Sequence, residues 1–360
     1  MNKKERMLFF ELCKFKDKNQ KKLGKLLDEG AMTPHVLGQL FSNRMAGAAY
    51  GELGRARLLD RLNREIRNPL KNGHIQNIVR NRSYYNCLSE LNKILRPADG
   101  KYTFLKGAYL CSWYPPGYRT SNDIDILTEP KNVTSISNLL YEAGFRQGHL
   151  RKNRFVPATR REIISSKMMR GETVPFIKEV SKPFMKYLEV DINYSLSYKN
   201  EQNDLIYELV SGSKKVMVGD MKITTLSKYD FMIYLCEHLY KEATTYPWVR
   251  MMRDMTIYKF CDIYALLCDY SKKDFTDLRR RINKLGLNKA CYYAIYITKE
   301  LFSMNRMHLN NFLAEIQPDE EDILNIVIDP PNSKTYRYMD EDMEKRFFKE
   351  DRAKLLEEVT

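Results

Sequence analysis

The segment LKGAYLCSWYPPGYRTSNDIDIL, residues 105–127, places two aspartates one residue apart in an apolar run. The run DIDIL predicts a β-strand, in which successive side chains point to opposite faces. Asp123 and Asp125 therefore share one face, while Ile124 and Ile126 share the other. Two carboxylates about 7 Å apart along a strand repel each other, so the pattern is typical of a site that receives a cation.

A second strand with the same alternation is predicted in YLEVDINYSL, residues 187–196. Glu189, Asp191 and Asn193 share its polar face. If this strand lies beside DIDIL, Asp191 completes a cluster of three carboxylates. Such a cluster can hold Mg²⁺, which prefers oxygen ligands, and two such ions can stabilise the attacking and leaving oxygens of a phosphoryl displacement. The third carboxylate is also placed to accept the proton of an attacking hydroxyl, and the alternation alone does not decide whether Glu189 or Asp191 is that group.

The residues just before the aspartate pair have the features of a phosphate site. Gly107 lets the backbone approach a ligand, and AYLCSWY is a candidate short helix whose first amides could bind an anion. Lys106 and Arg119 can neutralise phosphate oxygens, Arg119 through a bidentate contact. In most proteins both side chains would be solvated surface charges. Beside paired aspartates they are candidates for binding a triphosphate.

These motifs resemble those of the DNA polymerase β-type nucleotidyltransferase superfamily, in which a glycine turn, an Asp-x-Asp strand and a later carboxylate occur in this order. More narrowly, Leu-Lys-Gly-Ala … Arg … Asp-Ile-Asp resembles the bacterial uncharacterised nucleotidyltransferase group. The resemblance implies Asp123, Asp125 and Asp191 as catalytic residues and metal ligands, for two Mg²⁺ or alternatively Mn²⁺. It also implies nucleotide and phosphate contacts, which fall on Lys106, Gly107, Ala108 and Arg119.

The sequence departs from the group's pattern at two places. Ala108 stands where a small hydroxyl residue usually follows the glycine, which removes one side-chain phosphate donor. Asn193 and Tyr194 stand where the group has His-Trp, which affects the acceptor side of the pocket more than the metal site. These departures keep a second hypothesis open, a catalytically inactive protein of this fold that binds nucleotide, nucleic acid or a partner protein.

The implied reaction moves a nucleoside monophosphate from an NTP such as ATP to an acceptor hydroxyl, with release of pyrophosphate. A protein, an antibiotic-like small molecule, a sugar phosphate and an RNA end are all compatible acceptors. Asp-x-Asp alone is also typical of turns and of glycosyltransferases that hold a nucleotide-sugar. Against the glycosyltransferase hypothesis, the chain has no long parallel βαβ series before the motif.

The expected fold class is α+β, with a small mixed β-sheet nucleotidyltransferase core between helical units. Residues 1–97 show apolar spacings of three and four, which predict a helical N-terminal unit. Short apolar runs predict the core at residues 98–200, and helical periodicity returns in a C-terminal unit at 201–330. The charged residues 331–360 have little apolar content to bury and are expected to form a mobile or peripheral helix.

Two further features are candidates for contact with ligands. His238 lies on the apolar face of a helix that Ser227 is predicted to cap, so it is a hydrogen-bonded core histidine or a nucleotide contact. The segment 146–182 is rich in basic residues and could contact an anionic acceptor or nucleic acid, although charge runs usually form a solvated face. Its basic residues include Arg151, Lys152, Arg154, Arg160, Arg161, Lys167 and Arg170.

Composition limits the class of protein. Sixty Lys and Arg against 46 Asp and Glu give a net charge of +14, which attracts polyanions. The seven cysteines have no CxxC pattern and no zinc-site spacing, which is typical of a reduced cytoplasmic protein. No apolar stretch reaches the roughly 18 residues that span a bilayer, so no membrane contact is expected.

Overall fold

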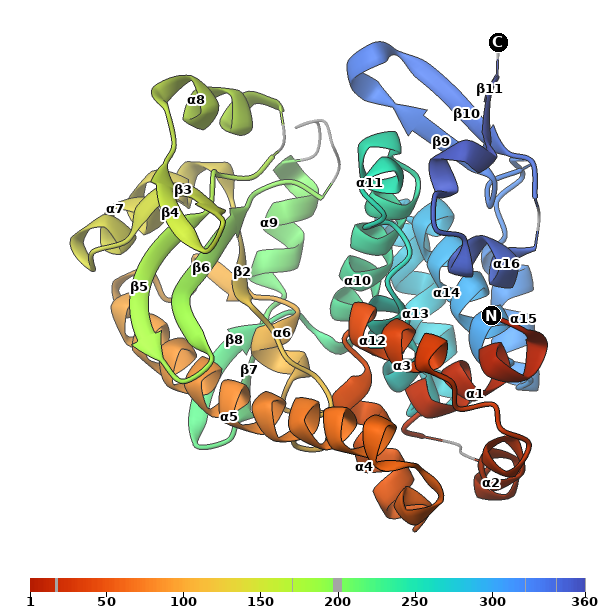
Figure 1. Cartoon of the computed structure of the whole chain (residues 1–360). Coiled ribbons are helices and arrows are strands. Elements are labelled where there is room, and N and C mark those ends of the chain that lie inside the picture. Colours follow the sequence, from red (N-terminus) through yellow and green to blue (C-terminus); the bar gives the residue numbers. More distant parts are fainter. Residues whose placement is uncertain (17–18, 170, 197–202, 321, 341, 360) are drawn as a thin grey trace. The chain divides into compact units, whose positions relative to one another are not determined.

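The computed structural model describes residues 1–16, 19–169, 171–196, 203–320, 322–340 and 342–359 (Figure 1). The chain forms two compact units, a sheet unit of residues 72–231 and a helical unit of residues 1–71 with 232–360. Two helices run through the boundaries between the units, α5 (Arg64–Ile94) and α10 (Lys228–Ala243).

The expected α+β class with a mixed sheet and flanking helices is confirmed, with a sheet larger than expected. Among the described residues the main sheet has eight strands in the order β4-β3-β5-β6-β2-β1-β8-β7. The sheet unit contains, in chain order, β1 (Tyr102–Phe104), α6 (Gly107–Leu110), β2 (Asp123–Thr128), α7 (Val133–Glu142), β3 (Arg146–Arg151), β4 (Arg154–Pro157), α8 (Arg160–Met169), β5 (Phe176–Lys182), β6 (Met185–Asn193), α9 (Asn203–Ser211), β7 (Lys214–Val218) and β8 (Met221–Thr225).

The observed units differ from the boundaries expected from sequence. Strands β7 and β8 fall in the range expected to be helical, but β8 pairs in parallel with β1 at Phe104 and Thr225, which makes both strands part of the sheet. The long helix α5 ends only at Ile94, and its second half supplies core residues to the sheet unit. The sheet unit therefore includes residues from both sides of the expected core, half of a helix before it and two strands after it.

One face of the sheet carries the apolar core of this unit. Ile124, Ile126 and Val190 point into it and are fully buried. They pack with apolar side chains of α5 and α7, including Leu91 and Ile136. Helix α7 packs its predicted apolar face into this core. Gly144, with φ of +89°, follows the end of the helix, as expected for a helix stop. Because this face is filled, the aspartates of β2 lie on the opposite face.

The helical unit is built around amphipathic helices. It contains α1 (Lys3–Cys13), α2 (Gln20–Asp28), α3 (Pro34–Ser42), α4 (Ala46–Arg55), α11 (Tyr246–Arg250), α12 (Ile257–Cys268), α13 (Lys272–Leu285), α14 (Asn288–Phe302), α15 (Met307–Ile316), α16 (Met343–Phe348), and the strands β9 (Ile326–Asp329), β10 (Lys334–Tyr338) and β11 (Leu356–Val359).

The charged C-terminal segment is packed into the helical unit, so the expectation of a mobile or peripheral helix is wrong. Its strands β10 and β11 form an antiparallel sheet with the preceding strand β9, in the order β11-β10-β9. Arg352 is buried and donates through Nε to Asp254 Oδ2 at 2.8 Å. The aromatic rings of Phe347 and Phe348 pack against Phe9 of α1. The carboxylate of Asp254, which is distant in sequence, and a cluster of aromatic rings thus hold this segment in place. Its own residues are too polar to form a core.

In the described part of the chain, no helix combines the length and the apolarity needed to cross a membrane.

Candidate active site

The two strands that carry the candidate carboxylates lie side by side. β2 and β6 pair in parallel, with Asp125 opposite Asp191 and Asp123 opposite Glu189. The pairing expected from the sequence alternation is therefore present, and it brings the three predicted aspartates to one face of neighbouring strands. Glu189 shares that face, so the structure places four carboxylates there. Their roles as ligands or bases remain predictions.

The environment of Asp125 and Asp191 favours the neutral forms of these two carboxyl groups. Asp125 is only 4% exposed. Burial raises the pKa of Asp125 from 3.8 to about 6, with Lys106 opposing the shift and the negative charge of Asp123 adding to it. Burial also raises the pKa of Asp191 well above its ordinary value, and repulsion from Asp125 and Asp123 adds to the rise. Repulsion among these carboxylates, which Lys106 only partly offsets, is what the sequence pattern predicts for side chains that receive a cation.

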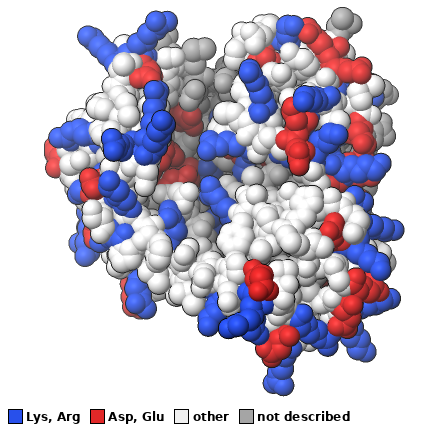
Figure 2. Space-filling model, viewed as in Figure 1, with Lys and Arg blue, Asp and Glu red and all other residues white. Residues whose placement is uncertain are grey.

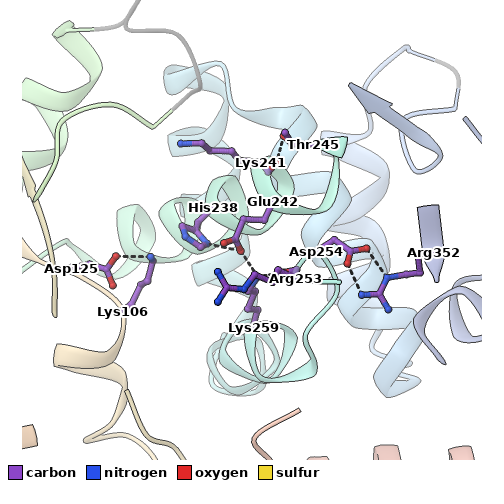
Figure 3. Close-up of polar contacts among 10 residues, drawn as sticks. All are labelled: Lys106, Asp125, His238, Lys241, Glu242, Thr245, Arg253, Asp254, Lys259 and Arg352. Carbon is purple, nitrogen blue, oxygen red and sulfur yellow. Dashed lines mark hydrogen bonds and ion pairs between the residues drawn. The ribbon is translucent and has the colours of Figure 1, made fainter. Parts of the chain in front are cut away.

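Lys106 supplies a positive charge at this cluster (Figure 3). Its Nζ lies 2.7 Å from Asp125 Oδ1, and its side chain is only 20% exposed. Lys106 has φ of +39°, which is uncommon for a residue with a Cβ atom and marks local backbone strain. The predicted phosphate ligand is thus not a solvated surface charge. It forms a partly buried ion pair with one of the predicted metal ligands.

Gly107 is required by close packing. A Cβ atom built at this position would lie 2.4 Å from Ser121 Oγ and 3.2 Å from the Tyr84 hydroxyl. The same two side chains hold the start of β2, because Ser121 Oγ donates to Asp123 Oδ1 at 3.0 Å and Tyr84 donates to the Asp123 carbonyl oxygen at 3.1 Å. The glycine turn and the first aspartate are therefore fastened to each other. The following helix, α6, has only four residues.

The segment between α6 and β2 is fixed to helix α5. Arg119 is buried at 7% exposure and donates to the Thr120 carbonyl oxygen, which excludes the solvated-charge interpretation. Asn81 of α5 donates to the Arg119 carbonyl oxygen at 2.9 Å. Arg80, also on α5, donates to Asn122 Oδ1 at 2.7 Å. Ala108 is fully buried.

Sequence analysis missed Arg80, Asn81, Tyr84 and Ser121 as supports of the site. Three of them lie on α5, about forty residues before the aspartates, and their helical periodicity carries no sign of this tertiary contact. Ser121 stands two residues before Asp123. A hydroxyl residue at this short distance from the first aspartate was the available sequence signal.

His238 lies on α10, with the part of that helix that belongs to the helical unit. Ser227 caps this helix as predicted, because Asp230 N donates to Ser227 Oγ at 3.4 Å. The Nδ1 atom of His238 is 3.4 Å from Glu242 Oε2, which also pairs with Lys259 (Figure 3). His238 thus has a carboxylate neighbour within its own helix, and its predicted contact with nucleotide remains a prediction.

The donor set suits a hard divalent ion in its chemistry. Asp123, Asp125 and Asp191 offer oxygen ligands, and such an ion would relieve the carboxylate repulsion that adds to burial in raising the pKa values of Asp125 and Asp191. As the side chains stand, no three His, Cys, Asp or Glu of the described ranges are arranged to hold a metal ion. Because the ammonium group of Lys106 is paired with the Asp125 carboxylate, a metal ion bound by Asp125 would have to displace this ammonium group.

Comparison with known proteins bears on the class of site. A crystal structure of an antigenic nucleotidyltransferase-like protein from Paracoccidioides brasiliensis matches 57% of this chain and 90% of its own, at 14% identity. Its TM-score of 0.31 is too low to bear on the fold. No curated protein matches the chain. The family described as uncharacterised nucleotidyltransferase matches residues 32–303, which include all of the candidate site residues, and the chain belongs to this family.

Proposed function

We propose that the protein transfers a nucleoside monophosphate from an NTP to an acceptor hydroxyl in a metal-dependent reaction that releases pyrophosphate. The observation that carries the proposal is the parallel pairing of β2 and β6, which sets Asp125 opposite Asp191 with Asp123 on the same face. Membership of the nucleotidyltransferase family supports the same class of reaction.

In the proposed reaction the acceptor oxygen attacks the α-phosphorus of the NTP. The bond between the α-phosphorus and its bridging oxygen to the β-phosphorus breaks, and pyrophosphate leaves with the bond electrons. In its ionised form Asp191 accepts the proton of the acceptor hydroxyl, and its raised pKa, caused by burial and neighbouring carboxylates, makes that carboxylate a stronger base. When bound, two Mg²⁺ would stabilise the attacking and leaving oxygens.

Lys106 has two anionic partners in this proposal. Without substrate its ammonium group neutralises Asp125 at 2.7 Å. With NTP bound, we expect the flexible side chain to reach a phosphate oxygen while the carboxylates turn to the metal. The fixed parts of the site are the Gly107 turn and Ser121, which are too closely packed to move independently. Lys106 therefore couples nucleotide binding to release of the carboxylate.

The test is nucleotidyl transfer from each α-labelled NTP, with Mg²⁺, to components of a cell extract, followed by mass analysis of the labelled product. The double variant Asp123→Asn with Asp125→Asn should lose transfer. Asp191→Asn should lose transfer as well, because the proposed base is gone.

Glu189→Gln is the matched control, because Glu189 lies on the same strand and face as Asp191 but opposite Asp123. This variant should retain transfer. Loss of transfer in Glu189→Gln with retention in Asp191→Asn would move the third carboxylate to Glu189. Unchanged transfer in the Asp123 and Asp125 double variant would refute the proposed site.

A second candidate function is binding of nucleotide without catalysis. The ion pair of Lys106 with Asp125 and the loss of the hydroxyl donor at Ala108 favour it. Calorimetry with NTP separates the two functions, since a three-carboxylate catalytic site should bind NTP strongly only with Mg²⁺. Equal NTP binding with Mg²⁺ and with EDTA, together with no transfer, would support the non-catalytic function.

A further inference from the structure

A strongly basic surface lies at one end of the main sheet, over β3, β4 and α8 (Figure 2). Six side chains of this surface are exposed, and none of them has an ion pair or hydrogen bond with the described residues. The only acid on the same three elements is Glu162, which accepts from the backbone N–H of Thr159. We call this surface the basic face, made of Arg151, Lys152, Arg154, Arg160, Arg161 and Lys167.

The positions of these charges are unfavourable in the isolated chain. Arg151 and Arg154 lie directly opposite each other in the β3–β4 hairpin, with Lys152 in the turn between them. Like charges in directly opposite positions destabilise a hairpin. Arg160 and Arg161 occupy the first turn of α8, where the helix dipole also disfavours cations. A bound polyanion would relieve both kinds of repulsion.

The basic face is fastened to the strand that carries Asp191. The hydroxyl of Tyr194, three residues beyond Asp191, donates to the Lys167 carbonyl oxygen at 2.8 Å. The Tyr194 N–H donates to the Gly171 carbonyl oxygen, also at 2.8 Å. A Cβ atom at Gly171 would lie 2.2 Å from Ser195 Cβ, so this connection is tightly packed. The C-terminal end of α8 therefore lies beside the end of β6 that follows Asp191.

We propose that the basic face binds the phosphate backbone of a nucleic acid, whose terminal hydroxyl is then the acceptor. The second half of this statement rests on the proposed nucleotidyl transfer, whereas the binding does not. The regularly spaced phosphates of a nucleic acid match cations spread over a hairpin and a helix, and arginine binds phosphate oxygens in a bidentate manner. An acidic protein segment would offer fewer and less regular charges. Arg170, predicted with this group, lies outside the described residues.

The test is binding of a labelled single-stranded RNA to the full chain, measured by fluorescence anisotropy over a range of salt concentrations. The variant Arg160→Gln with Arg161→Gln removes two of the six cations. It should weaken RNA binding about tenfold at low salt and reduce the slope of log Kd against log salt by about 1 to 1.5.

The chain offers a closely matched control in α13. Lys272 and Lys273 follow the capping residue Ser271, with Asp274 as its capping-box partner. Arg160 and Arg161 likewise follow Thr159, with Glu162 bonded to Thr159. Lys272→Gln with Lys273→Gln removes the same charge from the same helical position and should leave RNA binding unchanged. Equal weakening by both double variants would show that only net charge acts, and would overturn the proposal.

Two further arms separate the outcomes. Polyglutamate that binds as tightly as RNA, with the same sensitivity to the arginine variant, would replace the nucleic acid by an acidic protein partner and overturn the proposal. Asp191→Asn should still bind RNA, because the binding does not need the carboxylate. RNA binding without transfer in the wild type would end the proposed function but support the basic face, whereas transfer without RNA binding would do the reverse.

Discussion

Replacing Asp125 by Asn should abolish the loss of stability that this carboxylate causes as pH rises. In the folded protein its pKa is raised from 3.8 to about 6, chiefly by burial. The folded state therefore holds this proton more tightly than the unfolded chain, and the free energy of unfolding falls as pH rises through this window. A shift of about two units corresponds to about 3 kcal/mol, lost between about pH 4 and pH 7.

The assay is urea unfolding at a series of pH values in EDTA, for the wild type and for Asp125→Asn. Because Asn does not titrate, the free energy of unfolding of the variant should rise by about 3 kcal/mol relative to that of the wild type as pH rises through this window. Asp254→Asn is the matched comparison, since Asp254 is also buried and ion-paired, and it accepts hydrogen bonds from two nitrogens of the buried Arg352. That variant should be destabilised by about 3–5 kcal/mol, as expected when a buried ion pair loses one partner.

The prediction is that the two substitutions change the free energy of unfolding in opposite directions: Asp125→Asn raises it relative to the wild type as pH rises, and Asp254→Asn lowers it. A constant difference between Asp125→Asn and the wild type at all pH values would show that Lys106 fully compensates Asp125. That result would refute the view that burial and carboxylate repulsion exceed what the Lys106 ion pair offsets.

Three other substitutions follow from the same contacts. Gly107→Ala should destabilise the sheet unit by about 1–3 kcal/mol in urea unfolding, because its Cβ atom would lie 2.4 Å from Ser121 Oγ in a packed region. Lys106→Met should weaken NTP binding in calorimetry while strengthening Mn²⁺ binding in a metal titration, because the ammonium group leaves the carboxylate. Arg154→Gln should raise the thermal stability of the protein slightly, by about 0.2–1 kcal/mol, because it removes the repulsion with Arg151.

Each of these substitutions has its own check. Gly38→Ala lies within α3 with nothing within 4 Å of the new Cβ atom, and it should not destabilise the protein. Lys106→Arg keeps the positive charge, so it should retain most of the wild-type affinity for NTP, whereas Lys106→Met should lose it. Unaltered metal binding in Lys106→Met would contradict competition between the ammonium group and the ion. Destabilisation by Arg154→Gln would show that the cross-strand charges do not repel.

The central strands were predictable from sequence because a short-period pattern decides them. In DIDIL and YLEVDIN the alternation of apolar and acidic residues fixed both the strands and the face of each aspartate. Only the pairing of β2 with β6 depended on long-range contact, and it was stated as a condition. The structure meets this condition with Asp125 opposite Asp191.

The rest of the fold depends on contacts that the local sequence does not determine. The hairpin β7–β8 was missed, although Gly219 and Asp220 stand between two alternating segments and are typical of a turn. The polar C-terminal segment was expected to be peripheral because its composition is charged. Arg352 is buried there beside Asp254, a carboxylate 98 residues earlier that accepts hydrogen bonds from its guanidinium group.

NTP binding measured by isothermal titration calorimetry tests the central claim most directly. The titrations use wild type in Mg²⁺, wild type in EDTA, and Asp191→Asn in Mg²⁺. If three carboxylates from β2 and β6 bind the metal and the nucleotide together, only the wild type in Mg²⁺ should bind NTP tightly. Equal NTP affinity in all three titrations would contradict a metal-dependent site at these strands.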